Sequence, residues 1–163
     1  MRNWLIIHFA AETERIRNIF SCIYRYHSVL EVSAGIVIKE GKILCMQRGQ
    51  SKYRYISNKY EFPGGKIEAG EEPKTALIRE FEEELNADIS SSQIDLIGEI
   101  NHNYPDFSIK MFVFTIKTNK FSFTKNEHLD HKWVQPDELT KLDWAEADKQ
   151  IIERMRGSIV ERI

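Results

Sequence analysis

The segment 60–88 constrains this chain more than any other, because it combines closely spaced glycines with a helix rich in carboxylates. Its sequence is YEFPGGKIEAGEEPKTALIREFEEELNAD. Pro73 suits the first turn of a helix, where its missing N–H costs nothing, and the residues that follow as far as Leu85 are mostly good helix formers. Leu77, Phe81 and Leu85 recur every fourth residue. They share one helix face, which we expect to pack on a core.

A second face of this helix carries a cluster of carboxylates. Glu80, Glu83 and Glu84 are spaced at i, i+3 and i+4, so they project on the same side. Like charges this close repel each other, and a hard cation among them would offset the repulsion. Carboxylates with few other ligands suit Mg²⁺, which keeps water and substrate phosphate oxygens in its coordination shell. The alternative is a solvated helix face, a common arrangement for runs of glutamate.

The turn before the helix favours the metal site over the solvated face. Gly64 and Gly65 allow close approach of the backbone and the dihedral angles that phosphate and metal sites often require. Arg79 directly precedes Glu80 and can pair with Glu71 or a neighbour, which would hold the acidic face in place. Together these features predict a divalent metal bound against the phosphates of a nucleotide.

The same segment resembles the Nudix box of the Nudix hydrolases, and the match extends over many fixed positions. The positions that carry the resemblance are Gly65, Glu71, Arg79, Glu80, Phe81, Glu82, Glu83, Glu84 and Leu85. One position departs, because Asn86 stands where the family usually has glycine. Asparagine is the next best residue for a left-handed helix C-terminus, so we expect the change to be tolerated.

The resemblance implies cleavage of a nucleoside diphosphate linked to another group. It implies a metal, Mg²⁺ or alternatively Mn²⁺, held by Glu80, Glu83, Glu84 and the carbonyl of Gly64. It also implies that Glu83 or Glu84 helps to take a proton from the attacking water, with Arg79 as a further member of the catalytic set.

Apolar and β-branched runs on both sides of this segment predict strands at 30–39, 42–47, 94–101 and 109–117, the first two joined as a hairpin. Both faces of 109–117 are apolar, which predicts a sheet covered on both sides. With helices before and after, the pattern predicts an α/β sandwich. The resemblance implies its Nudix-type α/β/α form, in which a mixed, curved β-sheet lies between helices.

Length and composition bound the remaining alternatives. A chain of 163 residues with 42% hydrophobic content suits one domain with a substantial core. We expect a Nudix domain at 29–158, preceded by an extension of unknown role at 1–28 with a weak helical pattern. The net charge of −2 argues against nucleic-acid binding, and no apolar run is long enough to span a bilayer. Two cysteines make no disulfide framework, which favours the cytoplasm.

Candidate contacts for the substrate's phosphates lie outside the carboxylate cluster. Arg48 stands at the end of the second strand, and Lys66 follows the glycines. The family often places an arginine at the first of these positions to meet phosphates. In MutT-type members, a glutamate six residues before an equivalent of Trp133 is a further metal ligand or catalytic base, and Glu127 holds that position here. The alternative is a solvated loop glutamate.

Two histidines next to Glu127 resemble a metal pair only at first sight. His128 and His131 have no carboxylate or cysteine placed around them by the sequence. We therefore expect exposed loop histidines rather than metal ligands.

The last predicted helix carries a carboxylate on its apolar face. Asp143 and Glu146 resemble a capping box, so the helix is predicted to begin at Trp144. Asp148 then lies in the middle of the apolar face made by Trp144, Ile151, Ile152 and Met155. A carboxylate on a buried face is costly unless it is paired or functional. If the Asp148 carboxylate is paired, its partner is a nearby lysine or a backbone donor.

The functional reading of Asp148 is recognition of the base. In MutT-type enzymes this position carries an asparagine that bonds the oxidised guanine, and the related (deoxy)cytidine triphosphate pyrophosphohydrolases carry aspartate. An ionised carboxylate can only accept, and cytosine offers its N4 amine, although guanine-type bases offer donors as well. Tyr104 and Phe107 could stack on the base from the facing loop, but aromatic side chains more often pack.

These inferences predict a MutT-like nucleoside triphosphate pyrophosphohydrolase that converts NTP and water to NMP and diphosphate. The expected substrates are 8-oxo-dGTP-type oxidised nucleotides, or CTP and dCTP. The alternatives are hydrolysis of another nucleoside diphosphate derivative and a nucleotide-binding Nudix module without catalysis. The expected partner is the small-molecule nucleotide, and the expected assembly is a monomer or a homodimer.

Overall fold

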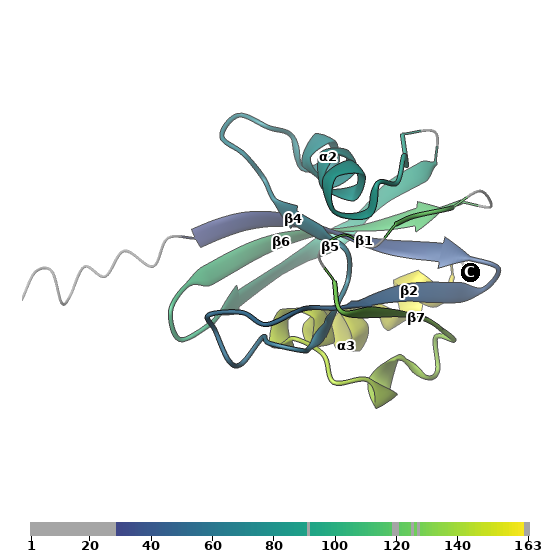
Figure 1. The fold of residues 1–163 in the computed structure, drawn as a ribbon. Coiled ribbons are helices and arrows are strands. Elements are labelled where there is room, and N and C mark those ends of the chain that lie inside the picture. Colours follow the sequence, from purple (N-terminus) through teal and green to yellow (C-terminus); the bar gives the residue numbers. More distant parts are fainter. Residues whose placement is uncertain (1–28, 91, 119–120, 125, 127, 162–163) are drawn as a thin grey trace, which may run out of the picture.

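The computed structural model describes residues 29–90, 92–118, 121–124, 126 and 128–161. In chain order the elements are β1 (Val29–Lys39), β2 (Lys42–Gln47), β3 (Tyr60–Glu61), β4 (Gly64–Lys66), α2 (Pro73–Leu85), β5 (Gln93–Asn103), β6 (Ser108–Lys117), β7 (Asp130–Val134), the 3-10 helix η1 (Leu139–Lys141) and α3 (Glu146–Val160) (Figure 1). All four predicted strands are present, and the expectations about 1–28 and Glu127 fall outside the described residues.

The sheet is mixed, as expected, and its main path runs β3-β2-β1-β6-β5. β1 is parallel to β6 and antiparallel to β2, and β5 is antiparallel to β6. β4 also pairs with β1, at residues 32–34, whereas β2 pairs with β1 only at its far end. The glycine-containing strand therefore enters the sheet where β1 has no other partner on that side.

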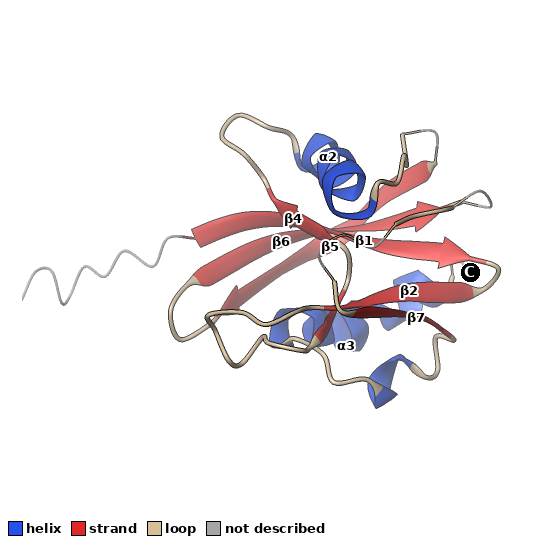
Figure 2. Ribbon diagram, in the orientation of Figure 1, coloured by secondary structure: helices blue, strands red, loops and turns tan. Residues whose placement is uncertain are grey.

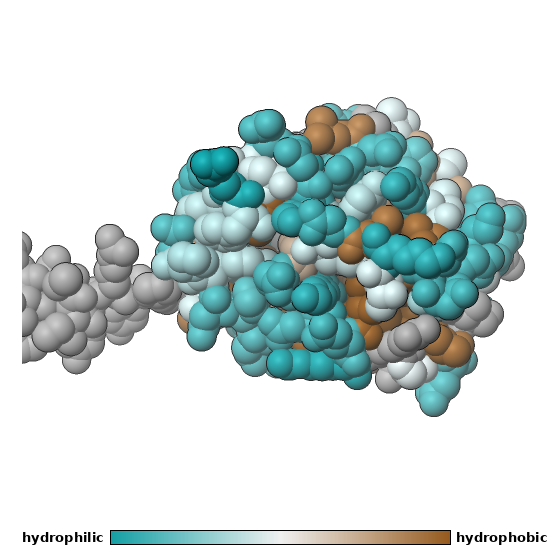
Figure 3. Space-filling view, turned by 90° about the horizontal axis from the view of Figure 1, so that it is seen from below, coloured by the Kyte–Doolittle hydropathy of each residue, from teal (hydrophilic) through white to brown (hydrophobic). Residues whose placement is uncertain are grey.

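Helices cover both faces of the sheet, which makes the α/β/α sandwich (Figures 1 and 2). Under α2 the core includes Val37, Phe81 and Ile116, and under α3 it includes Ile36 and Val113. The alternation along β1 and β6 sends consecutive side chains to opposite faces, and both sets are buried. The surface seen from below is mostly hydrophilic, with apolar residues only in small patches (Figure 3).

The end of α2 agrees with the sequence, whereas the start of α3 does not. Asn86 has φ 48° and ψ 40°, the left-handed conformation predicted for it. The predicted start of the last helix at Trp144 is wrong, because α3 begins at Glu146 and its N-terminus has no side-chain cap. The Asp143 carboxylate instead binds Lys59 Nζ at 2.6 Å. The backbone of residue 144 forms a bridge to Tyr60, which holds this stretch extended.

None of the described helices is long and apolar enough to cross a membrane.

Replacing Gly35 by alanine should lower the free energy of unfolding by about 1–3 kcal/mol, the usual cost of overfilling a core. A Cβ at this position would lie 2.7 Å from Ile116 Cδ1 and 2.8 Å from the Phe81 ring. Denaturant unfolding measures the effect. Gly157→Ala is the matched control, because a Cβ on this helical glycine has open space around it and alanine favours the helix. Equal stability of the two variants would contradict the tight packing.

Candidate functional site

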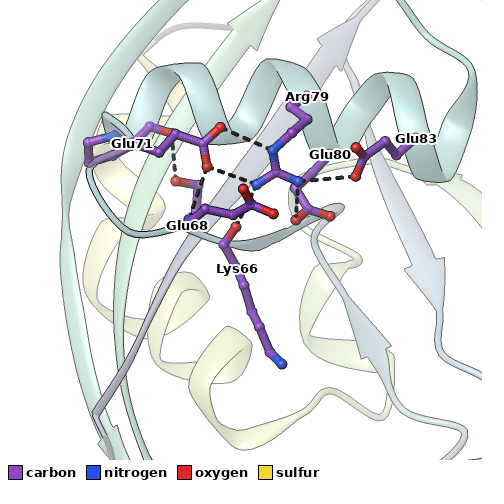
Figure 4. A network of polar contacts seen from close by, with 8 residues as sticks. Lys66, Glu68, Glu71, Arg79, Glu80 and Glu83 are labelled. Carbon is purple, nitrogen blue, oxygen red and sulfur yellow. Dashed lines mark hydrogen bonds and ion pairs between the residues drawn. The ribbon is translucent and has the colours of Figure 1, made fainter.

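Arg79 organises the acidic face of α2 (Figure 4). Its guanidinium donates to both carboxylate oxygens of Glu71, at 3.0 and 2.9 Å, as the sequence predicted. It also donates to Glu80 at 2.9 Å, to Glu83 at 3.1 Å and to the carbonyl of Lys66 at 2.8 Å. The hydrogen bonds that Arg79 donates to Glu71 raise the pKa of Arg79, and the same bonds lower the pKa of Glu71. The Arg79 guanidinium therefore ties the carboxylates of the helix to β4.

The two glycines before the helix leave room that a side chain would fill. Gly64 has φ 141° and lies against the carbonyl of Ser33. A Cβ on Gly65 would overlap the carboxylate of Glu80. The Glu80 side chain, only 13% exposed, is thus packed directly against the backbone of the turn. The glycines are required for this approach, in agreement with the prediction from the sequence.

The donors on this face suit a hard cation in their chemistry. Glu80, Glu83 and Glu84 offer only carboxylate oxygens, and Glu80 lies next to the Gly64–Gly65 backbone. In the described part of the chain, no three His, Cys, Asp or Glu side chains converge to make a complete metal site. Arg79 stands between Glu80 and Glu83, and the Glu83 side chain is 60% exposed.

A pocket of about 500 Å³ opens beside the turn. All five substrate contacts predicted from the sequence line it together with Gly64, namely Arg48, Lys66, Tyr104, Phe107 and Asp148. These side chains come from the ends of β2 and β4, from the β5–β6 connection and from α3. The fold thus brings together residues that lie a hundred positions apart in the sequence.

Asp148 lines this pocket and is itself buried, with 4% of the residue exposed. Its Oδ1 accepts a hydrogen bond from the backbone N–H of Phe62 at 2.9 Å. Burial, followed by the nearby charge of Glu61, raises the pKa of Asp148 to about 8. At neutral pH this group is therefore mainly a neutral acid, which can donate one hydrogen bond and accept others. From the sequence we expected a buried face but considered only the ionised carboxylate, which accepts and does not donate.

The aromatic residues at the mouth pack against one another. The rings of Tyr53, Tyr55, Tyr104 and Phe107 form a closed cycle, with neighbouring centroids 5.0–5.6 Å apart. Tyr104 is 8% exposed, and its hydroxyl accepts from the backbone N–H of Ala147 at 3.3 Å. Tyr53 also lines the pocket, and the sequence offered only one sign of it, two tyrosines in a polar loop.

Arg48 reaches the pocket with a partner that the sequence did not indicate. Its Nε donates to Glu61 Oε2 at 2.7 Å, and Glu61 Oε1 lies 3.2 Å from His128 Nε2. The His128 side chain is only 6% exposed, so the expectation of an exposed loop histidine is wrong for this residue. His131 is exposed, as expected. Glu61 was missed because its partners lie 13 and 67 residues away in the chain.

Glu127 is not among the described residues, but the residue before it is. Asn126 donates from its backbone N–H to the carbonyl of Glu84 at 3.2 Å and from its side chain to the carbonyl of Glu83 at 3.3 Å. Thr124 donates in the same way to the carbonyl of Leu85 at 2.7 Å. These bonds satisfy backbone acceptors that the end of a helix leaves open.

Known proteins resemble this chain in sequence and in fold. The CTP pyrophosphohydrolase of Escherichia coli K12 is 32% identical over 77% of this chain and 90% of its own length, and the 8-oxo-dGTP diphosphatase of the same organism is 27% identical over 78% and 96%. The solution structure of the E. coli ORF135 protein superposes with a TM-score of 0.68 at 27% identity, covering 84% of this chain and 95% of that one. The NUDIX domain model matches residues 29–155, and the chain therefore belongs to the Nudix hydrolase family.

Proposed function

We propose that this chain hydrolyses a nucleoside triphosphate to the monophosphate and diphosphate. The observation that carries the proposal is a single pocket that runs from the Gly64–Gly65 turn beside the carboxylate helix to the buried acid of Asp148. A nucleotide has the same two-part character, a charged phosphate chain and a base with a hydrogen-bonding edge. Relatives named for 8-oxo-dGTP and for CTP support this class of substrate.

Nudix hydrolases generally need a divalent metal. We propose Mg²⁺, with Mn²⁺ as an alternative, held by Glu80, Glu83, Glu84, the carbonyl of Gly64 and Glu127. When bound, such an ion supplies positive charge against the phosphate oxygens and makes water more acidic. The ligand types agree with a hard cation, since all are oxygens.

The remaining tasks fall to side chains of the chain itself. Arg48 and Lys66 line the phosphate end of the pocket and would bind phosphate oxygens. Glu83, largely exposed, is free to turn toward the substrate and accept a proton from the attacking water, with Glu84 and Glu127 as the other candidates. Arg79 holds Glu80 and Glu71 in fixed positions, which keeps the acidic face preorganised.

At the base end, the protonation of Asp148 broadens the choice of substrate. A protonated carboxyl group presents an O–H donor next to a carbonyl acceptor. Cytosine presents its N4 amine beside N3, and a guanine-type base presents N1–H beside O6, so either edge is complementary. The presence of aspartate here thus favours neither CTP nor 8-oxo-dGTP by itself. Phe107 and Tyr53 supply aromatic surface at the mouth of the same pocket.

A nucleotide panel tests the proposal. Release of diphosphate should be measured from CTP, dCTP, dGTP, 8-oxo-dGTP and ATP, with Mg²⁺, with Mn²⁺ and with chelator. We expect metal-dependent hydrolysis and a clear preference for one base. Equal rates on every triphosphate would contradict base reading by Asp148. Binding of nucleotides without turnover of any of them would indicate a module that binds nucleotides without catalysis. Turnover only of other nucleoside diphosphate derivatives would indicate that these, and not triphosphates, are the substrates.

We also propose the wider setting of this activity. Residues 29–158 would form the catalytic domain, with α3 running two residues further to Val160, and 1–28 would be an extension outside it. The chain would act in the cytoplasm on a small-molecule nucleotide, as a monomer or a homodimer. Activity of a protein that starts at Val29, compared with the full chain, tests the boundary, and light scattering gives the assembly.

A further inference from the structure

The pocket contains a charged pair whose geometry has a consequence for the proposed substrate. Arg48 and Glu61 both line it, at the ends of the neighbouring strands β2 and β3. The two strands are paired through Met46 and Glu61, and the N–H of Arg48 donates to the carbonyl of Lys59, just before β3, at 2.9 Å. The pair is therefore built on the sheet rather than on a loose loop.

The contact between them uses only one side of the guanidinium. Arg48 Nε donates to Glu61 Oε2 at 2.7 Å, and among the described residues the two terminal nitrogens of Arg48 make no hydrogen bond. A guanidinium has five N–H donors in a rigid plane, so fixing Nε sets the direction of the other four. The terminal fork matches two oxygens of a phosphate group.

Glu61 is itself held by a second contact. Its Oε1 lies 3.2 Å from His128 Nε2, and since a carboxylate only accepts, Nε2 carries the proton of this bond. Both side chains are largely buried, with 13% of Glu61 and 6% of His128 exposed. The backbone N–H of Leu129 donates to the carbonyl of Gln47 at 2.9 Å, which fixes the approach to β7 beside β2. His128 and Arg48 thus contact different oxygens of the Glu61 carboxylate.

We infer that Glu61, anchored by His128, is a positioning residue that holds Arg48 with its terminal nitrogens free for the phosphates of the substrate. The inference rests on the proposed function. Glu61 itself contacts no substrate, and its effect passes through Arg48. Without Glu61, Arg48 Nε would lose the acceptor that fixes the plane of the guanidinium, and the direction of its terminal nitrogens would no longer be set.

A double-mutant cycle with Glu61→Ala and Arg48→Ala tests this inference. Glu61→Ala should raise KM for the preferred triphosphate about 10- to 100-fold, the usual effect of losing one charged hydrogen bond. It should leave kcat nearly unchanged, because the carboxylates of α2 are untouched. In the Arg48→Ala background the same substitution should have no further effect. Losses that multiply in the double variant would overturn the inference.

Further variants separate positioning from a general effect on folding. Glu61→Gln keeps an acceptor for Arg48 Nε and should recover much of the lost affinity. His128→Ala should raise KM in the same direction but less. Asp143→Asn is the matched control, since it removes a carboxylate from another ion pair nearby, with Lys59, that does not line the pocket. If Glu61→Ala does not fold, His128→Ala carries the cycle with Arg48→Ala.

Binding of inorganic tripolyphosphate with Mg²⁺, measured by calorimetry, keeps the two hypotheses distinguishable. This probe has no base and needs no hydrolysis, so it reports on Arg48 even if no nucleotide on the panel is cleaved. We expect the affinity for tripolyphosphate to fall about 10- to 100-fold in Glu61→Ala. The Arg48→Ala variant and the double variant should bind tripolyphosphate with equal affinity. Hydrolysis by the unmodified protein with unchanged tripolyphosphate binding in Glu61→Ala would refute the positioning role alone.

Discussion

Glu83→Gln is expected to lower kcat by about 10²- to 10⁴-fold, the range typical of losing a group that takes a proton during catalysis. The amide has almost the same shape as the carboxylate, but it carries no charge for a metal ion and accepts no proton. The side chain is 60% exposed, and its described contact is a 3.1 Å bond from Arg79 that an amide oxygen can still accept. The fold should therefore remain intact.

The measurement is release of diphosphate at saturating triphosphate and Mg²⁺, with circular dichroism and denaturant unfolding to check the fold. Glu82→Gln is the matched control, because this neighbour on α2 is exposed and lies outside the proposed ligand set. It removes the same charge from the same helix and should leave kcat close to that of the unmodified protein. Near-normal turnover of Glu83→Gln would refute the proposed mechanism.

Asp148→Asn is expected to stabilise the protein increasingly as the pH rises from about 4 to about 8. Burial raises the pKa of Asp148 from 3.8 to about 8, so in this window the folded chain keeps a proton that the unfolded chain releases. Stability then falls with rising pH, by up to about 1.4 kcal/mol per pH unit for one group. Asparagine does not titrate, and its oxygen can still accept from Phe62 N–H. The free energy of unfolding of the variant therefore lacks this decrease with rising pH.

Denaturant unfolding of both proteins at pH 5, 7 and 9 gives the difference directly, since the other titrating groups are common to both. The difference should grow up to about pH 8 and stay constant above it. Asp137→Asn, at an exposed aspartate ahead of α3, should change stability little at any of these pH values. A difference for Asp148→Asn that does not vary with pH would show that this acid is not kept protonated.

The same variant links stability to base recognition. An asparagine offers a donor and an acceptor at every pH, as the neutral acid does only below its pKa. We therefore expect kcat/KM of the unmodified protein to fall above about pH 8 while that of Asp148→Asn stays level. The resemblance is consistent with this expectation, because MutT-type members carry asparagine at the corresponding position.

The sequence by itself determined the carboxylate helix and the turn before it. Spacing within one helix decides which side chains share a face, so the grouping of Glu80 with Glu83 followed from the sequence alone. The left-handed conformation of Asn86 followed in the same way, because it is a preference of the residue itself at the end of a helix. These features depend on neighbours a few positions away, and such neighbours are visible in the sequence.

Only the tertiary structure decided the chemistry of the other end of the pocket. The pKa of Asp148 depends on burial and on the charge of Glu61, and both arise from segments 86 or 87 positions apart that the sheet and α3 bring together. The partnership of His128 with Glu61 has the same origin. The start of α3 was also a tertiary matter, because Lys59 binds the Asp143 carboxylate that the sequence assigned to a cap. At each of these positions, contacts between distant segments outweigh local preference.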